Sequence, residues 1–461
     1  MKFPFWPDQK GYRDIDLGLS RVYQLLERLD NPHLKLPPTI HLAGTNGKGS
    51  TLSFLRSIFA ESGLSVHTYT SPHLVNFNER ITLAGAEISD DFLNKVLRDC
   101  KNAAEISPKI EVTYFEGITV AAFLAFSQVK ADVLLLEVGM GGRLDATNVL
   151  PKVLCSIITP IAFDHTDFLG NTLAKIAFEK GGIIKKNCPT LIGKQKASAL
   201  KTLENQACTV NSAFKVFDRD WKIKKEKNGF LFEGFGKKMS LPLPSLLGDH
   251  QLENASLAIA AALLQKQFLI SENQIKSALQ KTFWAARLQK IESGKFAKML
   301  PKSCKLYLDG SHNLQGAATI LRFLKIEKSR KKEILKQVQD DDSLNRHPEL
   351  VSGSFVKPKN KKIFVIFSML EDKDCGGFLK KIAAEVDHLF ALAIPNETKS
   401  RKALDIKQIA EKNGLKTTAV ENFDEAFAKI LSLRKADEEA LILVCGSLYL
   451  AGSFLAENAT I

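Results

Sequence analysis

A glycine-rich segment between an expected strand and an expected helix constrains this chain more than any other feature. Residues 42–50 read Leu-Ala-Gly-Thr-Asn-Gly-Lys-Gly-Ser, after the extended run Thr39–His41 and before a helical pattern that begins at Thr51. A strand, a glycine turn with one lysine and a hydroxyl, and a helix N-terminus can cradle nucleotide phosphates, because free backbone N–H groups and the helix dipole face the anion. The sequence therefore predicts a chain that consumes ATP or GTP. The alternative, a flexible glycine turn with a solvated lysine, leaves the flanking strand and helix unexplained.

Apolar runs alternate with helical patterns along most of the chain. In the first part we expect strands at Thr39–Ala43, Leu64–Tyr69, Val133–Val138, Val153–Ile158 and Thr190–Ile192, and helices at Thr51–Glu61, Phe92–Asn102, Gly117–Ser127, Leu173–Ile183 and Leu257–Leu264. The pattern restarts near residue 290, with strands at Lys305–Leu308, Ile363–Phe367, His388–Ile394 and Ala440–Cys445, and helices at Gln315–Leu324, Phe378–Glu385, Ile406–Asn413 and Asp424–Arg434. This alternation predicts the α/β fold class.

Two domains follow from this pattern. We expect a large P-loop-containing ATPase domain with a mainly parallel sheet over residues 1–289, and a smaller Rossmann-like α/β domain over residues 290–461. Residues 327–361 interrupt the second domain with lysine-rich and acidic stretches that carry little apolar surface. Such a composition favours a loop insertion without a catalytic role.

Composition excludes several classes of protein. The seven cysteines are scattered and never form a C-x-x-C pair, which argues against a disulfide framework and a structural zinc site. The net charge of +13 comes from lysines and arginines spread along the chain without interleaved aromatics, so we expect attraction of anionic small molecules rather than nucleic acid. With no signal peptide and no apolar run long enough to cross a bilayer, we expect a cytoplasmic monomer that binds no membrane.

A carboxylate ends one of the expected strands. Glu137 follows the apolar run Val133–Leu136 and precedes Val-Gly-Met-Gly-Gly-Arg-Leu-Asp-Ala-Thr-Asn. Because parallel strands bring their carboxyl ends to one edge of a sheet, Glu137 is expected beside the phosphate loop, where a phosphate-bound Mg²⁺ needs an oxygen ligand.

Several of these segments together resemble one family. The loop departs from the usual G-x-x-x-x-G-K-[ST] because Gly44 lies three residues before Gly47 and Gly49 separates Lys48 from Ser50. Five segments resemble the folylpolyglutamate and dihydrofolate synthases of the Mur ligase superfamily. They are G-T-N-G-K-G-S, the Glu137 motif, Asp164-His165 with the following L-G-x-T and I-A-F-E-K, the Ser71-Pro72-His73-Leu74 loop and Asp309-Gly-Ser-His-Asn. The resemblance runs from about residue 15 to 455.

The resemblance implies an ATP-dependent ligase. Its substrates would be ATP, L-glutamate and 7,8-dihydropteroate or reduced folates, and it would form an acyl phosphate before the amide bond. A synthase that lacks the dihydropteroate reaction remains an alternative. A nucleotide-hydrolysing P-loop switch or binding module is a more remote one, since the guanine-specifying N-K-x-D of GTPases is absent from the expected positions.

The resemblance also implies a set of site residues. The catalytic residues would be Lys48, Lys180 and His165, with Lys180 carbamylated. Two Mg²⁺ ions would be held by Ser50, Ser71, Glu137 and His165. The nucleotide would contact Thr45, Asn46, Gly47, Lys48, Gly49, Ser50, Asn254, Arg287, Asp309 and His312. The pterin substrate would contact Phe77, Arg80, Thr113, Tyr114, Phe115, Glu116, Leu144, Asp145 and Ala146. Arg287 follows Ala-Ala where the family has Pro-Gly, so its loop is expected to differ.

Overall fold

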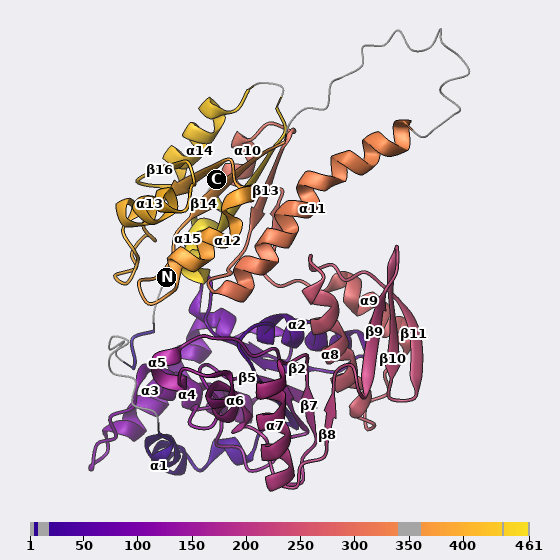
Figure 1. Cartoon of the computed structure of the whole chain (residues 1–461). Coiled ribbons are helices and arrows are strands. Elements are labelled where there is room, and N and C mark those ends of the chain that lie inside the picture. The colour runs from indigo at the N-terminus through magenta and orange to yellow at the C-terminus, as the bar shows by residue number, and fades with distance from the viewer. Residues whose placement is uncertain (1–3, 8–17, 340–360, 436–437, 460–461) are drawn as a thin grey trace. The chain divides into compact units, whose positions relative to one another are not determined.

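The computed structural model describes residues 4–7, 18–339, 361–435 and 438–459 (Figure 1). The chain forms two compact units, residues 1–284 and residues 285–461. The division falls a few residues before the boundary that we predict after residue 289.

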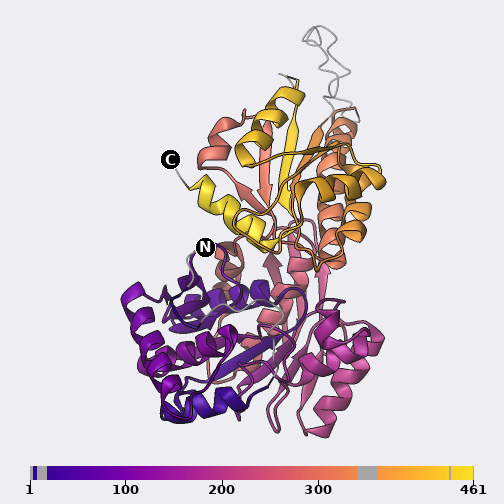
Figure 2. The same ribbon diagram turned by 90° about the vertical axis from the view of Figure 1, so that its left-hand side faces the viewer.

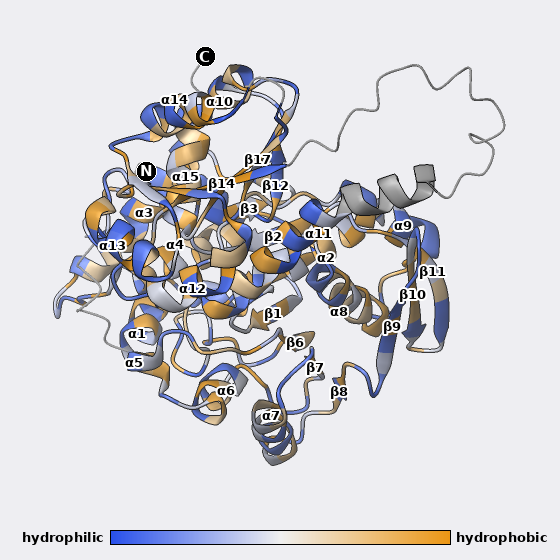
Figure 3. Cartoon of the chain, turned by 45° about the horizontal axis from the view of Figure 1, so that its top comes forward, coloured by the Kyte–Doolittle hydropathy of each residue, from blue (hydrophilic) through white to orange (hydrophobic). Residues whose placement is uncertain are grey.

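A mainly parallel sheet forms the centre of the first unit. Its strands lie in the order β4 (Ala86–Glu87), β3 (Ile81–Leu83), β2 (Val66–Tyr69), β5 (Val133–Glu137), β1 (Thr39–Ala43), β6 (Cys155–Ile158), β7 (Thr190–Ile192) and β8 (Phe214–Val216). Neighbouring strands in the row β2-β5-β1-β6-β7-β8 are parallel, whereas β3 pairs antiparallel with both β2 and β4. Every residue of β1 and β5 is buried, as expected for a parallel sheet covered on both faces. In Figure 3, β1 and β6 carry the orange colour of hydrophobic residues.

Helices cover both faces of this sheet, and the alternation of side chains along β5 separates two cores. Val133 and Leu135 pack with α2 (Lys48–Glu61), α8 (His250–Leu264) and α9 (Glu272–Lys281). Leu134 and Leu136 pack with α1 (Ser20–Arg28), α3 (Asp90–Glu105) and α4 (Tyr114–Gln128). The short helices η2 (Pro32–Leu34), η3 (Phe77–Arg80) and α5 (Thr166–Leu169) and the longer α6 (Leu173–Gly181) and α7 (Ala197–Thr209) complete the unit.

A small antiparallel sheet packs on α8 and α9. It consists of β9 (Trp221–Lys225), β10 (Gly229–Gly234) and β11 (Lys237–Pro242). Trp221, Phe230 and Phe232 join the core that α8 and α9 share. The sequence indicated only short strand-like pieces here, because lysines occupy the exposed face.

The second unit is a six-stranded sheet with helices on both faces (Figure 2). The strand order is β12 (Gln289–Ile291), β13 (Cys304–Leu308), β17 (Ala440–Cys445), β14 (Lys362–Phe367), β15 (His388–Ala391) and β16 (Thr417–Ala419), with β12 alone antiparallel to its neighbour. The helices are α10 (Lys295–Met299), α11 (Leu314–Gln339), α12 (Cys375–Ile382), η6 (Ala383–Glu385), α13 (Ala403–Lys412), α14 (Phe423–Leu433) and α15 (Leu448–Asn458). These two α/β units confirm the predicted fold class.

One expectation for the second unit is wrong. We expected a helix that ends at Leu324 and a loop from residue 327, but α11 continues to Gln339. The added residues are mostly Lys, Arg, Glu, Leu and Gln, which favour a helix even without an apolar face. Residues 340–360 of the predicted insertion lie outside the described residues.

The two ends of that insertion are joined by a buried ion pair. The Glu327 carboxylate is almost fully buried and pairs with the amine of Lys361, which directly precedes β14. The Lys305 amine lies 3.7 Å from the same carboxylate.

Among the residues that the structure describes, no helix has the length and apolar character that a membrane span requires.

Candidate active site

The carboxyl ends of the central strands bring three predicted segments together. In the parallel register, Leu42 of β1 lies opposite Glu137 of β5, and Tyr69 of β2 lies opposite Leu136. Glu137 therefore ends its strand between the phosphate loop and the segment that begins with Ser71. The backbone N–H of Ser71 donates a hydrogen bond of 3.3 Å to the Glu137 carboxylate. This places one predicted Mg²⁺ ligand directly beside another.

The phosphate loop ends at the first turn of α2. Gly47 caps the helix with a φ of 89°, a left-handed conformation that favours glycine, and its carbonyl accepts the N–H of Thr51. The N–H groups of the first turn have no acceptor within the helix and point beyond its end. Thr45 and Asn46 donate their N–H groups to the carbonyl of Pro160, at 3.0 and 3.2 Å. The loop is thus held against the segment after β6, with its helical donors free to meet an anion.

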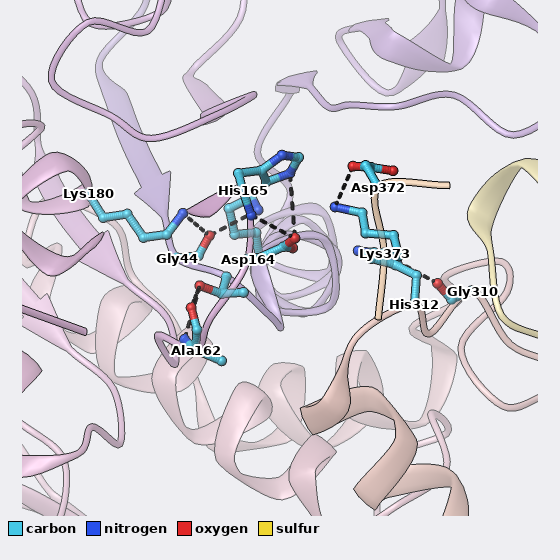
Figure 4. Close-up of polar contacts among 11 residues, drawn as sticks. Gly44, Ala162, Asp164, His165, Lys180, Gly310, His312, Asp372 and Lys373 are labelled. Atoms are coloured by element: carbon cyan, nitrogen blue, oxygen red, sulfur yellow. Dashed lines mark hydrogen bonds and ion pairs between the residues drawn. The ribbon is translucent and has the colours of Figure 1, made fainter. Parts of the chain in front are cut away.

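Two lysine amines share one acceptor in this loop. Lys48 and Lys180 both donate to the carbonyl oxygen of Gly44, at 3.1 and 2.9 Å (Lys180 and Gly44 are labelled in Figure 4). The Lys48 amine also lies 4.0 Å from the Glu137 carboxylate. Lys180 is buried, and burial together with the charge of Lys48 lowers its pKa to about 7. A substantial fraction of the Lys180 amine is therefore uncharged near neutral pH.

Helix α8 contributes polar groups to the other side of α2. The Gln251 amide donates to the Ser50 hydroxyl at 3.4 Å, and the Asn254 amide donates to Gln251 at 2.9 Å. A Cβ atom on Gly47 would collide with the Asn254 side chain. Asn254 and Ser50 are therefore joined through Gln251, which we did not predict as a site residue although it lies three residues before the predicted Asn254.

His165 stands at the start of α5 in a left-handed conformation, with a φ of 48°. Its backbone N–H donates to the Asp164 carboxylate at 3.0 Å, and its Nε2 atom lies 3.9 Å from the same oxygen. Figure 4 shows the ring turned back over Asp164. Asp164 is not among the predicted site residues, although it directly precedes the predicted ligand His165.

The donors at this edge fit a divalent cation of the Mg²⁺ type. The Glu137 carboxylate is 4% exposed and has a serine beside it, and Mg²⁺ prefers oxygen ligands and keeps several waters. Across residues 18–339 and the other described ranges, no cluster of three or more His, Cys, Asp or Glu side chains could hold a metal ion.

The segment after β2 is organised by Glu79. Its carboxylate accepts the N–H groups of Leu74, Val75 and Asn76 at 2.7, 2.9 and 2.7 Å. Figure 1 shows this unit with β2 and β5 adjacent. The three hydrogen bonds fix the course of the loop that carries the predicted pterin contacts.

Phe77 and Arg80 lie within that loop. The Arg80 guanidinium is 5.6 Å from the centre of the Phe77 ring, and its Nε donates to Nδ1 of His73 at 2.8 Å. Burial and the charge of Arg80 lower the pKa of His73 to about 3, so His73 is neutral. The Phe77 ring is 3% exposed and packs edge-on against His73. Its stacking on a pterin stays a prediction.

The second predicted pterin segment is the beginning of α4. Thr113 is the N-cap, and Glu116 completes a capping box by accepting the Thr113 N–H at 2.7 Å. Arg21 of α1 donates two hydrogen bonds to the same carboxylate, at 3.1 and 2.9 Å. These contacts fix the first turn, which carries the half-buried Tyr114 and Phe115. A lone arginine in α1 gave no signal in the sequence for this role.

Phe115 packs on a glycine beside the strand end. A Cβ atom on Gly139, which follows β5, would lie 2.4 Å from Cζ of the Phe115 ring. The Phe115 and Tyr69 ring centres are 6.2 Å apart. Phe115 thus lies next to the Glu137 motif, as a pterin contact at this edge requires.

The carboxylate of Asp145 is held by its own loop. It accepts the N–H of Met140 at 2.9 Å and both the N–H and the hydroxyl of Thr147 at 3.0 and 2.5 Å. Nε2 of buried His41 lies 2.9 Å from the Thr147 hydroxyl. Burial raises the pKa of Asp145. Leu144 is half-buried and Ala146 is buried beside it, so these three residues shape the loop after β5, and their contact with substrate stays a prediction.

The remaining predicted residues belong to the second unit. The Asp309 carboxylate accepts the N–H groups of Leu288 and Ser311, both at 2.8 Å, and so ties the Arg287 loop to the end of β13. Arg287 lies between two residues with positive φ, Ala286 at 55° and Leu288 at 45°. Nδ1 of His312 lies 3.0 Å from the Gly310 carbonyl (Figure 4). Their contact with a nucleotide stays a prediction.

Comparison with known families gives two matches. Residues 42–262 match the Mur ligase middle domain, and residues 349–448 match the Mur ligase glutamate ligase domain. The dihydrofolate synthase/folylpolyglutamate synthase of Bacillus subtilis is 33% identical over 448 residues, which cover 94% of this chain and 93% of the relative. The folylpolyglutamate synthase of Lacticaseibacillus casei is 30% identical over 446 residues, with 94% and 92% covered.

Solved structures are similar over nearly the whole chain. E. coli FolC in complex with DHPP and ADP has a TM-score of 0.80 and 27% identity, with 97% of this chain and 94% of that chain covered. The bifunctional folylpolyglutamate synthase/dihydrofolate synthase of Yersinia pestis, complexed with AMPPNP and Mn ion, has a TM-score of 0.78 and 27% identity, with 96% and 94% covered.

Proposed function

The chain belongs to the dihydrofolate synthase/folylpolyglutamate synthase family of Mur ligases, and we propose that it joins L-glutamate to 7,8-dihydropteroate and adds further glutamates to reduced folates, with ATP as the phosphoryl donor. The observation that carries this function is the arrangement at one sheet edge. The phosphate loop with Lys48 lies beside Glu137 and the loop that begins at Ser71. Nucleotide, cation and carboxylate substrate all have complementary groups there.

A carboxylate needs activation before an amine can displace its oxygen. The substrate carboxylate attacks the γ-phosphorus of ATP and releases ADP, and the glutamate amine then attacks the acyl phosphate and releases phosphate. The N–H donors of α2 and the Lys48 ammonium neutralise charge on the phosphates. Ser50 would be a ligand of the nucleotide-bound divalent cation, and Glu137, Ser71 and His165 would hold a second one. The two cations would supply further positive charge at the phosphates.

Lys180 is carbamylated in the active enzyme under this proposal. An uncharged amine adds CO₂ to give R–NH–COO⁻ and one released proton. Burial and a pKa of about 7 supply the uncharged amine, and the Lys48 ammonium on the same Gly44 carbonyl would face the new carboxylate. The modification turns a cation that would repel Mg²⁺ into an anion that attracts it.

Release of ADP tests the function directly. The purified chain is incubated with MgATP and either dihydropteroate or tetrahydrofolate, each with and without L-glutamate. We expect ADP release that requires both substrates, together with a product heavier by one glutamyl residue in mass spectrometry. Activity with tetrahydrofolate but not with dihydropteroate, both with L-glutamate, would show that the chain catalyses only the folylpolyglutamate synthase reaction. ADP release in the absence of the pterin substrate and L-glutamate, with no glutamylated product in the complete mixture, would favour a simple nucleotide hydrolase.

A further inference from the structure

Gly49, which separates Lys48 from Ser50, has a neighbour that accounts for it. Its backbone is not left-handed, so the helix itself does not require glycine there. A Cβ atom at this position would lie 2.7 Å from Nε1 and 2.8 Å from Cε2 of Trp284. The indole therefore rests directly on the first turn of α2, in the space that a side chain would need.

Trp284 is the last residue of the first unit, and the segment before it follows α2. The Lys281 amine lies 2.9 Å from both carboxylate oxygens of Glu61, the last residue of the helix. The Ser53 hydroxyl donates to the carbonyl of Phe283 at 2.8 Å, two turns nearer the phosphate loop. Residues 281–284 thus run along the helix from its end to its first turn, and residue 285 begins the second unit.

We propose that Trp284 is a positioning residue that couples nucleotide binding at the phosphate loop to the connection between the two units. The indole contacts the same helical turn whose N–H groups face the phosphates. An anion that orders this turn also orders the indole, and the Ser53 hydrogen bond passes that order to the backbone of Phe283. The inference rests on the proposed function only in taking a nucleotide as the anion.

Tryptophan fluorescence tests the coupling. The chain has three tryptophans, Trp6, Trp221 and Trp284. We expect MgADP to change the emission of the unmodified protein and of Trp221→Phe. The Trp221 indole lies between the small sheet and α8, where it is buried and donates to the Ser256 hydroxyl, so it is the control. The change should disappear in Trp284→Phe although calorimetry still detects MgADP binding. Emission that responds equally in Trp284→Phe would overturn the proposal.

Reciprocal substitution gives a second test that a purely structural role would not satisfy. Gly49→Ala should raise the KM for ATP about tenfold by displacing the indole, since small misplacements in a site have large effects. Trp284→Ala should raise it similarly with a smaller change in kcat. The double variant should bind ATP better than Gly49→Ala alone, because the collision is gone and alanine favours the helix. Additive losses in the double variant would contradict the contact as the cause.

Different results would contradict the nucleotide site and the role of Trp284. If calorimetry detects no MgADP binding to the unmodified protein, the phosphate-loop assignment and the coupling both fail. If MgADP binds while neither the emission nor the double variant behaves as expected, only the role of Trp284 fails. Circular dichroism of each variant establishes that the loss is not unfolding, and Trp284→Phe keeps an aromatic ring if Trp284→Ala does not fold.

Discussion

Both units have charged residues at the carboxyl end of a mainly parallel sheet, but the hydrogen-bond partners of these charged groups differ. In the first unit, Lys48 and Lys180 compete for the Gly44 carbonyl, and the second amine is buried with a lowered pKa. In the second unit, both oxygens of Asp309 are occupied by the N–H groups of Leu288 and Ser311.

The difference separates two uses of a buried charge. The Asp309 carboxylate accepts one N–H from its own loop and one from the Arg287 loop, so it stabilises the fold and shapes the chain around Arg287. The Lys48 and Lys180 amines share one carbonyl, and burial lowers the pKa of Lys180, so this pair is suited to meet phosphate or CO₂. Substitutions in the first unit should therefore affect the rate more than the stability, whereas Asp309 should affect the stability directly.

Among the variants that test this comparison, Lys48→Ala should cause the largest loss of ligation rate. We expect ligation to fall by roughly 10³-fold or more, because a charge that faces the phosphates is lost. The melting temperature should change little, since the Gly44 carbonyl keeps Lys180 as a donor. Steady-state ADP release and thermal denaturation measure the two quantities. Lys101→Ala, on the exposed surface of α3, is the control. Near-normal turnover would refute the phosphate-loop assignment.

Lys180→Arg and Lys180→Ala test the carbamate. Both should be nearly inactive, because a guanidinium does not form a stable carbamate and would remain a cation at the metal site. A short carboxylate such as formate should partly restore Lys180→Ala but not Lys180→Arg. A folded Lys180→Arg enzyme that retains most of its rate would rule out the carbamate.

Glu137→Gln and Asp309→Asn contrast the two sheet edges. Glu137→Gln should lower kcat by about 10²-fold or more with little change in melting temperature, since volume and the Ser71 contact are kept. Asp309→Asn should reduce the free energy of unfolding by about 1–3 kcal/mol, because its NH₂ group faces an N–H donor that has lost its acceptor. The comparison fails if Glu137→Gln melts many degrees lower while Asp309→Asn melts normally.

The pH dependence of stability isolates Lys180. Its pKa is about 7 in the folded chain against 10.5 for a free lysine, so between these values the folded state binds fewer protons than the unfolded state. The free energy of unfolding should therefore rise with pH across this window, by at most about 1.4 kcal/mol per pH unit, relative to Lys180→Met. Denaturant titrations between pH 7 and 9 in CO₂-free buffer measure the difference. A difference independent of pH would show that the amine stays charged.

Removal of residues 340–360 should have the smallest effect. With a short glycine-serine linker between residues 339 and 361, the ion pair of Glu327 and Lys361 is kept, and loop length changes closure by only about 0.6 kcal/mol per doubling. We expect unchanged ligation and melting temperature. A soluble but inactive product, with the full chain active in parallel, would give the segment a role in catalysis.

The sequence predicted the alternating elements of both sheets and the family, because apolar periodicity and long motifs are local. It did not predict the full length of α11, because residues 325–339 favour a helix through their intrinsic propensity and carry little apolar periodicity. It also did not predict Arg21 on Glu116, or Trp284 on Gly49, because contacts between residues far apart in the chain leave no mark in a single sequence.

The three glycines of the phosphate loop have consequences for how this loop can change. Each one faces a different partner: Gly44 meets Thr159, Gly47 meets Asn254 and Gly49 meets Trp284. An added methyl group at any of them collides with a residue from another part of the chain. At Gly49 a paired replacement, in which Trp284 becomes smaller, can remove the collision. At Gly44 and Gly47 the positive φ of 149° and 89° disfavours any side chain even when the partner becomes smaller. Libraries that randomise residues 44–49 alone should return almost only glycine at these three positions.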